Sequence, residues 1–229
     1  QSIPLALING RIGEKSFRGY SRIKPLVRHV LSCFNVMAVQ NEVYAERLRA
    51  LGASADKVVV TGNIKFDRVE SERDNPQTNE LRRVFGLAEG EQVFIAGSTQ
   101  SPEESIALDT WMALREEFPQ LRLVLVPRHK ERFDEVASLV LKKGLPLRRR
   151  SSAGSEATAA SEVAVDNSVP PVLLLDTLGE LGACWGLADI AFVGGSLTNR
   201  GGQNMLEPGG YGAAVLFGPN TWNFRDVAE

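Results

Sequence analysis

Short apolar runs alternate with amphipathic stretches along most of the chain. In the first part, the runs at 3–8, 36–40 and 57–62 have the length and composition of buried strands. The stretch at 42–52, EVYAERLRALG, has helical spacing and ends on Gly52, which suits a helix C-terminus. Apolar strands joined by a helix predict a parallel βαβ arrangement.

The same alternation returns in the second part of the chain. Five apolar runs are strand candidates: 92–97, 121–127, 172–176, 190–194 and 213–218. Helices are predicted between them, near 103–117, 130–143, 179–187 and 204–211. Strands this apolar, separated by helices, predict a parallel sheet that is covered on both faces.

Two polar stretches interrupt the pattern. Residues 67–80, DRVESERDNPQTNE, carry many charges and no apolar run, so they are predicted to link two domains. Residues 148–169 are rich in Ser and Ala and are predicted to form a surface loop. The sequence therefore predicts an α/β fold with two Rossmann-like domains. Residues 1–66 are the C-terminal part of the first domain, and 81–229 form the second, truncated at its end.

Composition and charge narrow the class of protein. The 229 residues are 43% hydrophobic and 24% charged, as is ordinary for an α/β protein, and the net charge of −2 gives no argument for nucleic acid. No apolar run reaches the 18–20 or so residues that span a bilayer. Cys33 and Cys184 lie in apolar stretches and are predicted to be buried, reduced thiols. The chain has no initiator Met, and we expect a fragment that lacks sequence at both ends.

Ligands of open α/β sheets bind beyond the carboxyl ends of the strands, so the residues after each run carry the functional prediction. After the run at 92–97, Ser98 and Thr99 precede a helix start that offers backbone N–H groups to an anion. Ser101 and Glu104, with Pro102 between them, match a capping box. A capped helix without any ligand is the alternative interpretation.

Arg128 follows Pro127 at the end of the next run. Proline fixes its own backbone angle and so helps to aim the following side chain. A guanidinium at this position suits a two-pronged grip on a phosphate. The alternatives are a surface salt bridge for Arg128 and a structural role for His129.

The turn at 177–180, TLGE, follows the run at 172–176. Asp176 or Thr177 is predicted to cap a helix, and Gly179 allows a ligand to approach the backbone closely. Backbone contacts to a nucleotide base suit this turn. Glu180 has an alternative interpretation as a first-turn carboxylate favoured by the helix dipole.

The segment at 194–212, GGSLTNRGGQNMLEPGGYG, gives the strongest signal. Four glycines flank a polar loop that opens a helix: Gly194, Gly195, Gly201 and Gly202. Glycine permits positive φ angles and close backbone approach. Asn204 and Glu207 are three residues apart and share a helix face, where a carboxylate is placed to accept hydrogen bonds from ribose hydroxyls.

Together these segments resemble one enzyme family. NGRIGEKSFRGY, AVQNEVYAERLRALGA, GSTQSPEE, LVPRHKERF, LLDTLGELGACWGLADIAFVGGSL and GGQNMLEP occur in the order typical of 3-deoxy-D-manno-octulosonic acid (Kdo) transferases. The resemblance covers nearly the whole chain except 148–169. It implies a GT-B fold whose first domain is only partly present. It also implies an inverting, metal-independent glycosyltransferase that moves Kdo from CMP-Kdo to a lipid A precursor in lipopolysaccharide core biosynthesis.

The resemblance also assigns site residues. It implies CMP binding by a set drawn from three segments: Pro127, Arg128, Thr177, Leu178, Gly179, Glu180, Asn204, Met205, Leu206 and Glu207. Within this set Arg128 stabilises the leaving phosphate and Glu207 binds the ribose. Further donor contacts are expected from Ser98, Thr99, Gly201 and Gly202.

The chain departs from the family pattern at four positions. The family usually has Met at Leu178, His at Gln203 and Pro at Met205, and His is common at Gln100. Leu for Met and Met for Pro preserve backbone contacts. Gln in place of His argues against a proton-transfer or charge role at those two positions.

The resemblance places two further features upstream of residue 1: the catalytic glutamate and a membrane anchor. No catalytic base is therefore assigned within the chain, which we expect to bind donor without turning over. We expect no cofactor and no metal, since the sequence has no DxD motif or His/Asp cluster. The expected partners are CMP-Kdo and a lipid A precursor, with no nucleic acid. The expected location is peripheral, at the cytoplasmic face of the bacterial inner membrane.

Two other functions remain open at this stage. The first is a different GT-B nucleotide-sugar enzyme, such as a UDP-sugar transferase or a UDP-GlcNAc 2-epimerase, because the fold is shared. The second is a non-catalytic nucleotide-binding module. A preference for UDP over CMP would favour the first of these.

Overall fold

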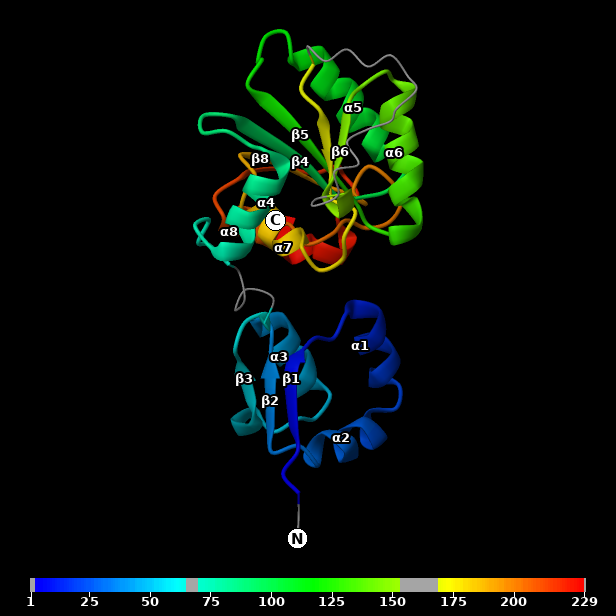
Figure 1. The fold of residues 1–229 in the computed structure, drawn as a ribbon. Helices are drawn as coiled ribbons and strands as arrows, with labels where there is room; N and C mark the ends of the chain where they lie inside the picture. Colours follow the sequence, from blue (N-terminus) through cyan, green and yellow to red (C-terminus); the bar gives the residue numbers. More distant parts are fainter. Residues whose placement is uncertain (1–2, 65–69, 153–168, 229) are drawn as a thin grey trace. The chain divides into compact units, whose positions relative to one another are not determined.

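The computed structural model describes residues 3–64, 70–152 and 169–228. The chain divides into two compact units, an N-terminal unit (Gln1–Arg68) and a C-terminal unit (Val69–Glu229), and each is built on its own parallel sheet (Figure 1). The N-terminal sheet has the strand order β1-β2-β3, and the C-terminal sheet has the order β6-β7-β5-β4-β8-β9. Two Rossmann-like units with parallel sheets confirm the predicted α/β class.

The N-terminal unit contains strands β1 (Ala6–Gly10), β2 (Val36–Val39) and β3 (Val58–Val60). Its helices are α1 (Glu14–Ser21), α2 (Lys24–Ser32), α3 (Glu42–Ala50) and the 3₁₀ turn η1 (Ala55–Lys57). The Asn41 side chain caps α3 by accepting a 3.0 Å hydrogen bond from the Tyr44 amide. Gly52, with φ +107°, turns the chain after the helix, and the predicted βαβ arrangement is confirmed.

The C-terminal sheet comprises β4 (Gln92–Thr99), β5 (Leu121–Pro127), β6 (Leu147–Arg149), β7 (Val172–Leu174), β8 (Ile190–Val193) and β9 (Ala214–Leu216). After β4 the chain adds β5, β6 and β7 on one side of it, and then crosses to add β8 and β9 on the other side. A crevice opens where strand order reverses in such a sheet, at the carboxyl ends of the strands. The end of β4 is therefore the place to look for a ligand.

Helices cover both faces of the C-terminal sheet, as predicted (Figure 1). One layer contains α5 (Glu103–Leu114), η3 (Lys130–Arg132) and α6 (Phe133–Lys142). The other contains α4 (Pro76–Phe85), α7 (Leu181–Trp185), α8 (Leu206–Gly210), η5 (Trp222–Phe224) and α9 (Arg225–Ala228). Along β4, Val93 and Ile95 pack into one core and Phe94 and Ala96 into the other, because alternate residues of a strand point to opposite faces.

The division between the units differs from the predicted linker at 67–80. The units separate at Arg68, and the second half of the predicted linker belongs to α4. Asn75 caps this helix by accepting a 2.9 Å hydrogen bond from the Thr78 amide, and the Thr78 hydroxyl donates to Ala183 O at 2.9 Å. Polar residues that looked like a linker are thus a helix start, fixed to the second unit.

Two smaller expectations are corrected by the structure. The predicted loop at 148–169 begins as the edge strand β6, followed by η4 (Arg150–Ser152); residues 153–168 lie outside the described residues. Cys184 is buried, and burial raises the pKa of its thiol, but Cys33 is exposed, so the prediction of two buried thiols is wrong for Cys33. Among the described residues, no helix has both the length and the apolar composition needed to cross a membrane.

Candidate functional site

A pocket opens at the carboxyl edge of the C-terminal sheet. It holds about 290 Å³ of space, solvent at its mouth included, and is lined by Ser98, Arg128, Leu181, Trp185, Val193, Gln203, Asn204 and Glu207. These residues come from the ends of β4, β5 and β8, from α7, and from α8 and the segment before it. The pocket therefore lies where the topology of a doubly wound sheet places a ligand.

Arg128 contributes an unpaired positive charge to the pocket wall. Its backbone amide donates to Thr99 O at 3.0 Å, which ties the end of β5 to the end of β4. Within the described part of the chain, its exposed guanidinium has no hydrogen-bond or ion-pair partner, so no surface salt bridge is found there. A guanidinium without an internal partner is available to an anion.

Asn204 and Glu207 form a hydrogen-bonded pair in the pocket lining. Asn204 Nδ2 donates to Glu207 Oε1 at 2.9 Å, and Asn204 Oδ1 accepts from the Leu206 amide at 3.2 Å. Since α8 begins at Leu206, Asn204 precedes the helix instead of lying on it as predicted. Among the described residues nothing bonds to Glu207 Oε2, which leaves one carboxylate oxygen free to accept from a ligand hydroxyl.

Ser98, which lines the pocket, has a strained backbone conformation. The β4–β5 register shifts between Gly97 and Thr99, and Ser98 has φ +54°, a left-handed value that is uncommon outside glycine. Gly194 passes so close that a Cβ there would lie 2.5 Å from Ser98 O. Strain of this kind persists only where the surroundings enforce it, and it clusters at functional sites.

Glu103 occupies the backbone donors next to this bulge. Its side chain is fully buried, and its carboxylate accepts hydrogen bonds of 2.8–3.1 Å from four backbone N–H groups: those of Gln100, Gly195, Ser196 and Leu197. The amides at the start of the glycine-rich loop are thus bonded to the protein itself. These amides are therefore not available to an anionic ligand, and Arg128 is the unpaired cation in the pocket lining.

The predicted capping box at Ser101 and Glu104 is wrong. The helix α5 begins at Glu103, after Pro102, with no side-chain cap. Glu103 bonds back to the Gln100 amide, whereas Glu104 is buried in an ion pair with Arg132. Only the glutamate contact of a capping box forms, and it joins Glu103 to Gln100, one position before the predicted pair.

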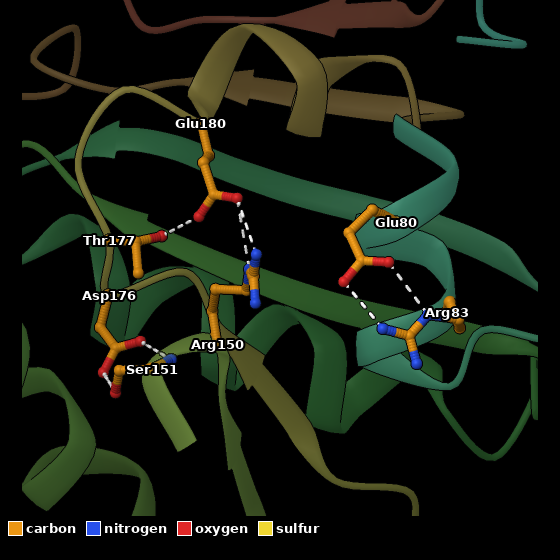
Figure 2. Close-up of polar contacts among 7 residues, drawn as sticks. All are labelled: Glu80, Arg83, Arg150, Ser151, Asp176, Thr177 and Glu180. Carbon is orange, nitrogen blue, oxygen red and sulfur yellow. Dashed lines mark hydrogen bonds and ion pairs between the residues drawn. The ribbon is translucent and has the colours of Figure 1, made fainter. Parts of the chain in front are cut away.

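The turn at 177–180 is closed by side chains (Figure 2). Thr177 Oγ1 donates to Glu180 Oε2, and Arg150 donates to Glu180 Oε1 from Nη2 at 3.0 Å and from Nε at 3.3 Å. Gly179 has φ +85° and Leu178 is 70% exposed. Neither Asp176 nor Thr177 caps α7, contrary to the prediction, since Glu180 is its N-cap residue. Leu181, the next residue, lines the pocket, so the turn lies beside it.

The other predicted contacts are not among the residues that line the pocket. Thr99, Pro127 and Met205 are buried in the fold. Gly201 faces Trp222, since a Cβ at Gly201 would lie 2.4 Å from the indole nitrogen. Gly202 faces the segment at 220–221, and Leu206 is half-buried in α8. Of the predicted residues, four line the pocket: Ser98, Arg128, Asn204 and Glu207.

Sequence reasoning missed the apolar side of the pocket. Trp185 is buried against Gly97, where a Cβ would come 2.4 Å from the ring, so the glycine makes room for the indole. In the part of the chain that the structure describes, the indole N–H of Trp185 has no hydrogen-bond partner. Gly97 was visible in the sequence, but nothing local connects it to a tryptophan in α7.

The described residues contain no group of three or more His, Cys, Asp or Glu side chains placed to hold a metal ion. The polar groups of the described lining that are available to a ligand include the guanidinium of Arg128, the free oxygen of Glu207, the hydroxyl of Ser98 and the side-chain amide of Gln203. A cation, an acceptor and a hydroxyl suit a phosphorylated and hydroxylated ligand.

Comparison with known proteins identifies the family that the chain is similar to. The family model described as 3-deoxy-D-manno-octulosonic-acid transferase (kdotransferase) matches residues 1–68. A Haemophilus influenzae 3-deoxy-D-manno-octulosonic acid transferase is 35% identical over 227 residues, which cover 99% of this chain and 50% of that protein. The Bordetella pertussis enzyme of the same name is 34% identical over 234 residues, covering 100% of this chain and 51% of that protein. The chain therefore spans about half the length of these curated relatives.

A solved structure matches as well. The C-terminal CMP-Kdo binding domain of WaaA from Acinetobacter baumannii is 33% identical, with a TM-score of 0.55, over 66% of this chain and 74% of that domain. This match confirms the predicted α/β fold of GT-B type. The chain belongs to the 3-deoxy-D-manno-octulosonic acid transferase family.

Proposed function

We propose that the protein transfers Kdo from CMP-Kdo to a lipid A precursor, and that its C-terminal unit holds the CMP part of the donor. One observation carries the proposal: the unpaired Arg128 guanidinium and the Asn204–Glu207 pair face the same pocket at the carboxyl ends of parallel strands. The proposal is supported by a similar solved domain that is named for CMP-Kdo binding.

In this proposal Arg128 binds the phosphate of the nucleotide and Glu207 binds its ribose. The guanidinium of Arg128 donates two hydrogen bonds to the single phosphate of the donor, and it stabilises the charge that builds on this phosphate as CMP departs. The free Oε2 of Glu207 accepts from a ribose hydroxyl, while Asn204 holds Oε1 in place. The turn at 177–180 lies against the base through its backbone.

The reaction is a direct displacement with inversion. A hydroxyl oxygen of the acceptor lipid bonds to the anomeric carbon of Kdo as the bond from that carbon to the phosphate oxygen breaks, and a carboxylate base takes the hydroxyl proton. The base implied by the family resemblance matches no residue of this chain. We further propose that neither metal nor cofactor takes part, and that the protein works at the cytoplasmic face of the bacterial inner membrane.

Calorimetric titration with CMP and UDP tests the ligand. We expect CMP to bind the chain more tightly than UDP. Preference for UDP would overturn the proposal in favour of a UDP-sugar enzyme.

A second titration tests the phosphate grip. Arg128→Ala is expected to raise the Kd of CMP at least about tenfold, which corresponds to about 1.4 kcal/mol. It should leave the Kd of cytidine, which lacks the phosphate, unchanged. Lys130→Ala removes the same charge from an exposed side chain two residues away and serves as the control. An equal loss for CMP and cytidine would show that Arg128 does not hold the phosphate.

A further inference from the structure

The last residue of β6 and the first two residues of η4 hold the segment that follows β7. Figure 2 shows the contacts of the two η4 residues, Arg150 and Ser151. We call Arg149, Arg150 and Ser151 the β6 clasp. Arg149 Nε donates to Asp176 Oδ2 at 2.6 Å, and the Ser151 amide donates to Asp176 Oδ1 at 2.8 Å. Arg150 reaches past Asp176 to Glu180, at the far end of the turn.

The bonds to Glu180 close the turn at both ends. One carboxylate oxygen accepts from Arg150 and the other from Thr177, so the first and last residues of the four-residue turn are tied to each other and to β6. Asp176 is held separately by Arg149 and Ser151. Loss of Arg150 therefore removes the contact between the turn and the clasp, while Asp176, after β7, keeps its bonds to Arg149 and Ser151.

The middle of the turn offers free backbone donors. Among the described residues, the amides of Leu178 and Gly179 have no hydrogen-bond partner. Leu178 is exposed, and Leu181, which follows the turn, lines the pocket. Unpaired N–H groups on a fixed turn beside a pocket are suited to a ligand with an acceptor atom in a defined place.

We propose that Arg150 is a positioning residue that makes this turn select cytosine over uracil, an inference that rests on the proposed function. A turn amide donates to N3 of cytosine, which is an acceptor, whereas N3 of uracil carries a hydrogen and repels an N–H donor. Such discrimination requires a rigid donor, because a mobile turn shifts to accommodate either base. Arg150, acting through Glu180, supplies the rigidity.

The contact geometry explains why this role is one of positioning. The side chains of Arg150 and Glu180 are 21% and 31% exposed, and ion pairs with this much solvent contact contribute little to folding. Two nitrogens of Arg150 approach the same oxygen of Glu180, a contact that the single ammonium of lysine reproduces only in part.

The experiment compares CMP with UMP, which differ only in the base. Both nucleotides are titrated into the 229-residue chain, its Arg150→Ala and Arg150→Lys variants, and the control Arg83→Ala. Arg83 forms an exposed ion pair with Glu80 near the clasp and has no bond to the turn (Figure 2). Arg150→Ala is expected to lower the ratio of the UMP Kd to the CMP Kd about tenfold. Arg150→Lys should restore part of this ratio, and Arg83→Ala should leave it unchanged.

A change in the ratio of the UMP Kd to the CMP Kd indicates a positioning role, because a general structural defect weakens the binding of both nucleotides equally. An unchanged ratio, or equal losses for CMP and UMP, overturns the inference. Thr177→Val, which removes the other bond to Glu180, is expected to lower the ratio in the same direction and carries the test if Arg150→Ala does not fold.

The outcome for the unmodified chain keeps the two proposals apart. If it binds no CMP, or prefers UDP, the proposed function fails and the inference with it. If it prefers CMP over UMP and every variant keeps that preference, only the inference fails.

Discussion

Two carboxylates at the same edge of the C-terminal sheet are held in different ways. Glu103 is fully buried, and its partners are backbone N–H groups from the segment before α5 and from the loop after β8. Glu180 is partly exposed, and its partners are the side chains of Arg150 and Thr177. Both fix a loop beside the pocket, but they are bonded to different kinds of donor.

The kind of donor decides what each carboxylate does for the protein. Backbone N–H groups in a buried loop cannot turn to solvent when their acceptor is removed, and each one left unpaired costs about 1–3 kcal/mol. Side-chain donors near the surface move into water instead, at little cost. The Glu103 contact is therefore expected to determine stability, and the Glu180 contact to determine the position of a turn.

The largest expected effect comes from Glu103→Ala. This change leaves four backbone donors without their acceptor and should lower the free energy of unfolding by at least about 3 kcal/mol, measured by urea denaturation. Glu104→Ala is the matched control, because Glu104 is the next residue and equally buried but is held by Arg132, which retains Glu135. If the free energy of unfolding fell equally in the two variants, backbone donors and side-chain donors would not differ in their effect on stability.

The next largest effect is expected for Gly194→Ala, in the same backbone-bonded region. A Cβ at Gly194 would lie 2.5 Å from Ser98 O and 2.6 Å from Thr99 Cα, and neither backbone atom can move aside alone. We expect a loss of about 2 kcal/mol in unfolding free energy. Gly182→Ala is the control, since a Cβ there meets nothing within 4 Å. A variant at Gly194 as stable as the control would show that this approach is not tight.

Asp176, which combines side-chain donors with burial, should have an intermediate effect that depends on pH. Burial acts to raise the pKa of its carboxyl, but hydrogen bonds from the Ser151 hydroxyl and amide, together with Arg149, outweigh burial and hold the pKa below its usual value. A carboxyl with a depressed pKa stabilises the fold fully above its unfolded pKa of about 3.9, and this contribution is lost as pH falls through the lower folded pKa.

The measurement compares the unmodified chain with Asp176→Asn by urea denaturation from neutral pH downward. We expect a difference of about 2 kcal/mol that is constant from about pH 7 to pH 5 and shrinks below about pH 4. Asp134→Asn removes the other, 87% exposed carboxylate bonded to Arg149 and should leave stability unchanged. A difference that grows as the solution becomes more acidic would contradict the assignment.

The sequence predicted the sheet of the C-terminal unit well because its strands are buried on both faces. Such strands are continuous apolar runs, and six of the seven residues of β5 and all of β7 fit that description. The rule that ligands bind beyond the carboxyl ends of strands then drew attention to Ser98, Arg128 and Glu207, which line one pocket.

The predictions that failed depended on contacts distant in sequence. Glu103 bonds to amides more than ninety positions away, and no local pattern separates it from Glu104. Arg150 lies at the start of a polar stretch that was interpreted as a surface loop, 30 positions before its partner Glu180. The helices α1 and α2 were not predicted, and of their residues only Leu31 is buried.

The smallest effects are expected for side-chain contacts at the surface. They test whether such a contact can position a turn without stabilising the fold. Arg150→Ala is expected to lower the unfolding free energy by no more than about 1 kcal/mol, since its pair with Glu180 is partly exposed and the guanidinium is free to hydrate. Arg83→Ala, in the exposed pair with Glu80, should give a urea midpoint indistinguishable from that of the unmodified chain. If Arg150→Ala lowered the free energy of unfolding as much as Glu103→Ala, the β6 clasp would be a contact that stabilises the fold. Arg150 would then not serve only to position the turn at 177–180.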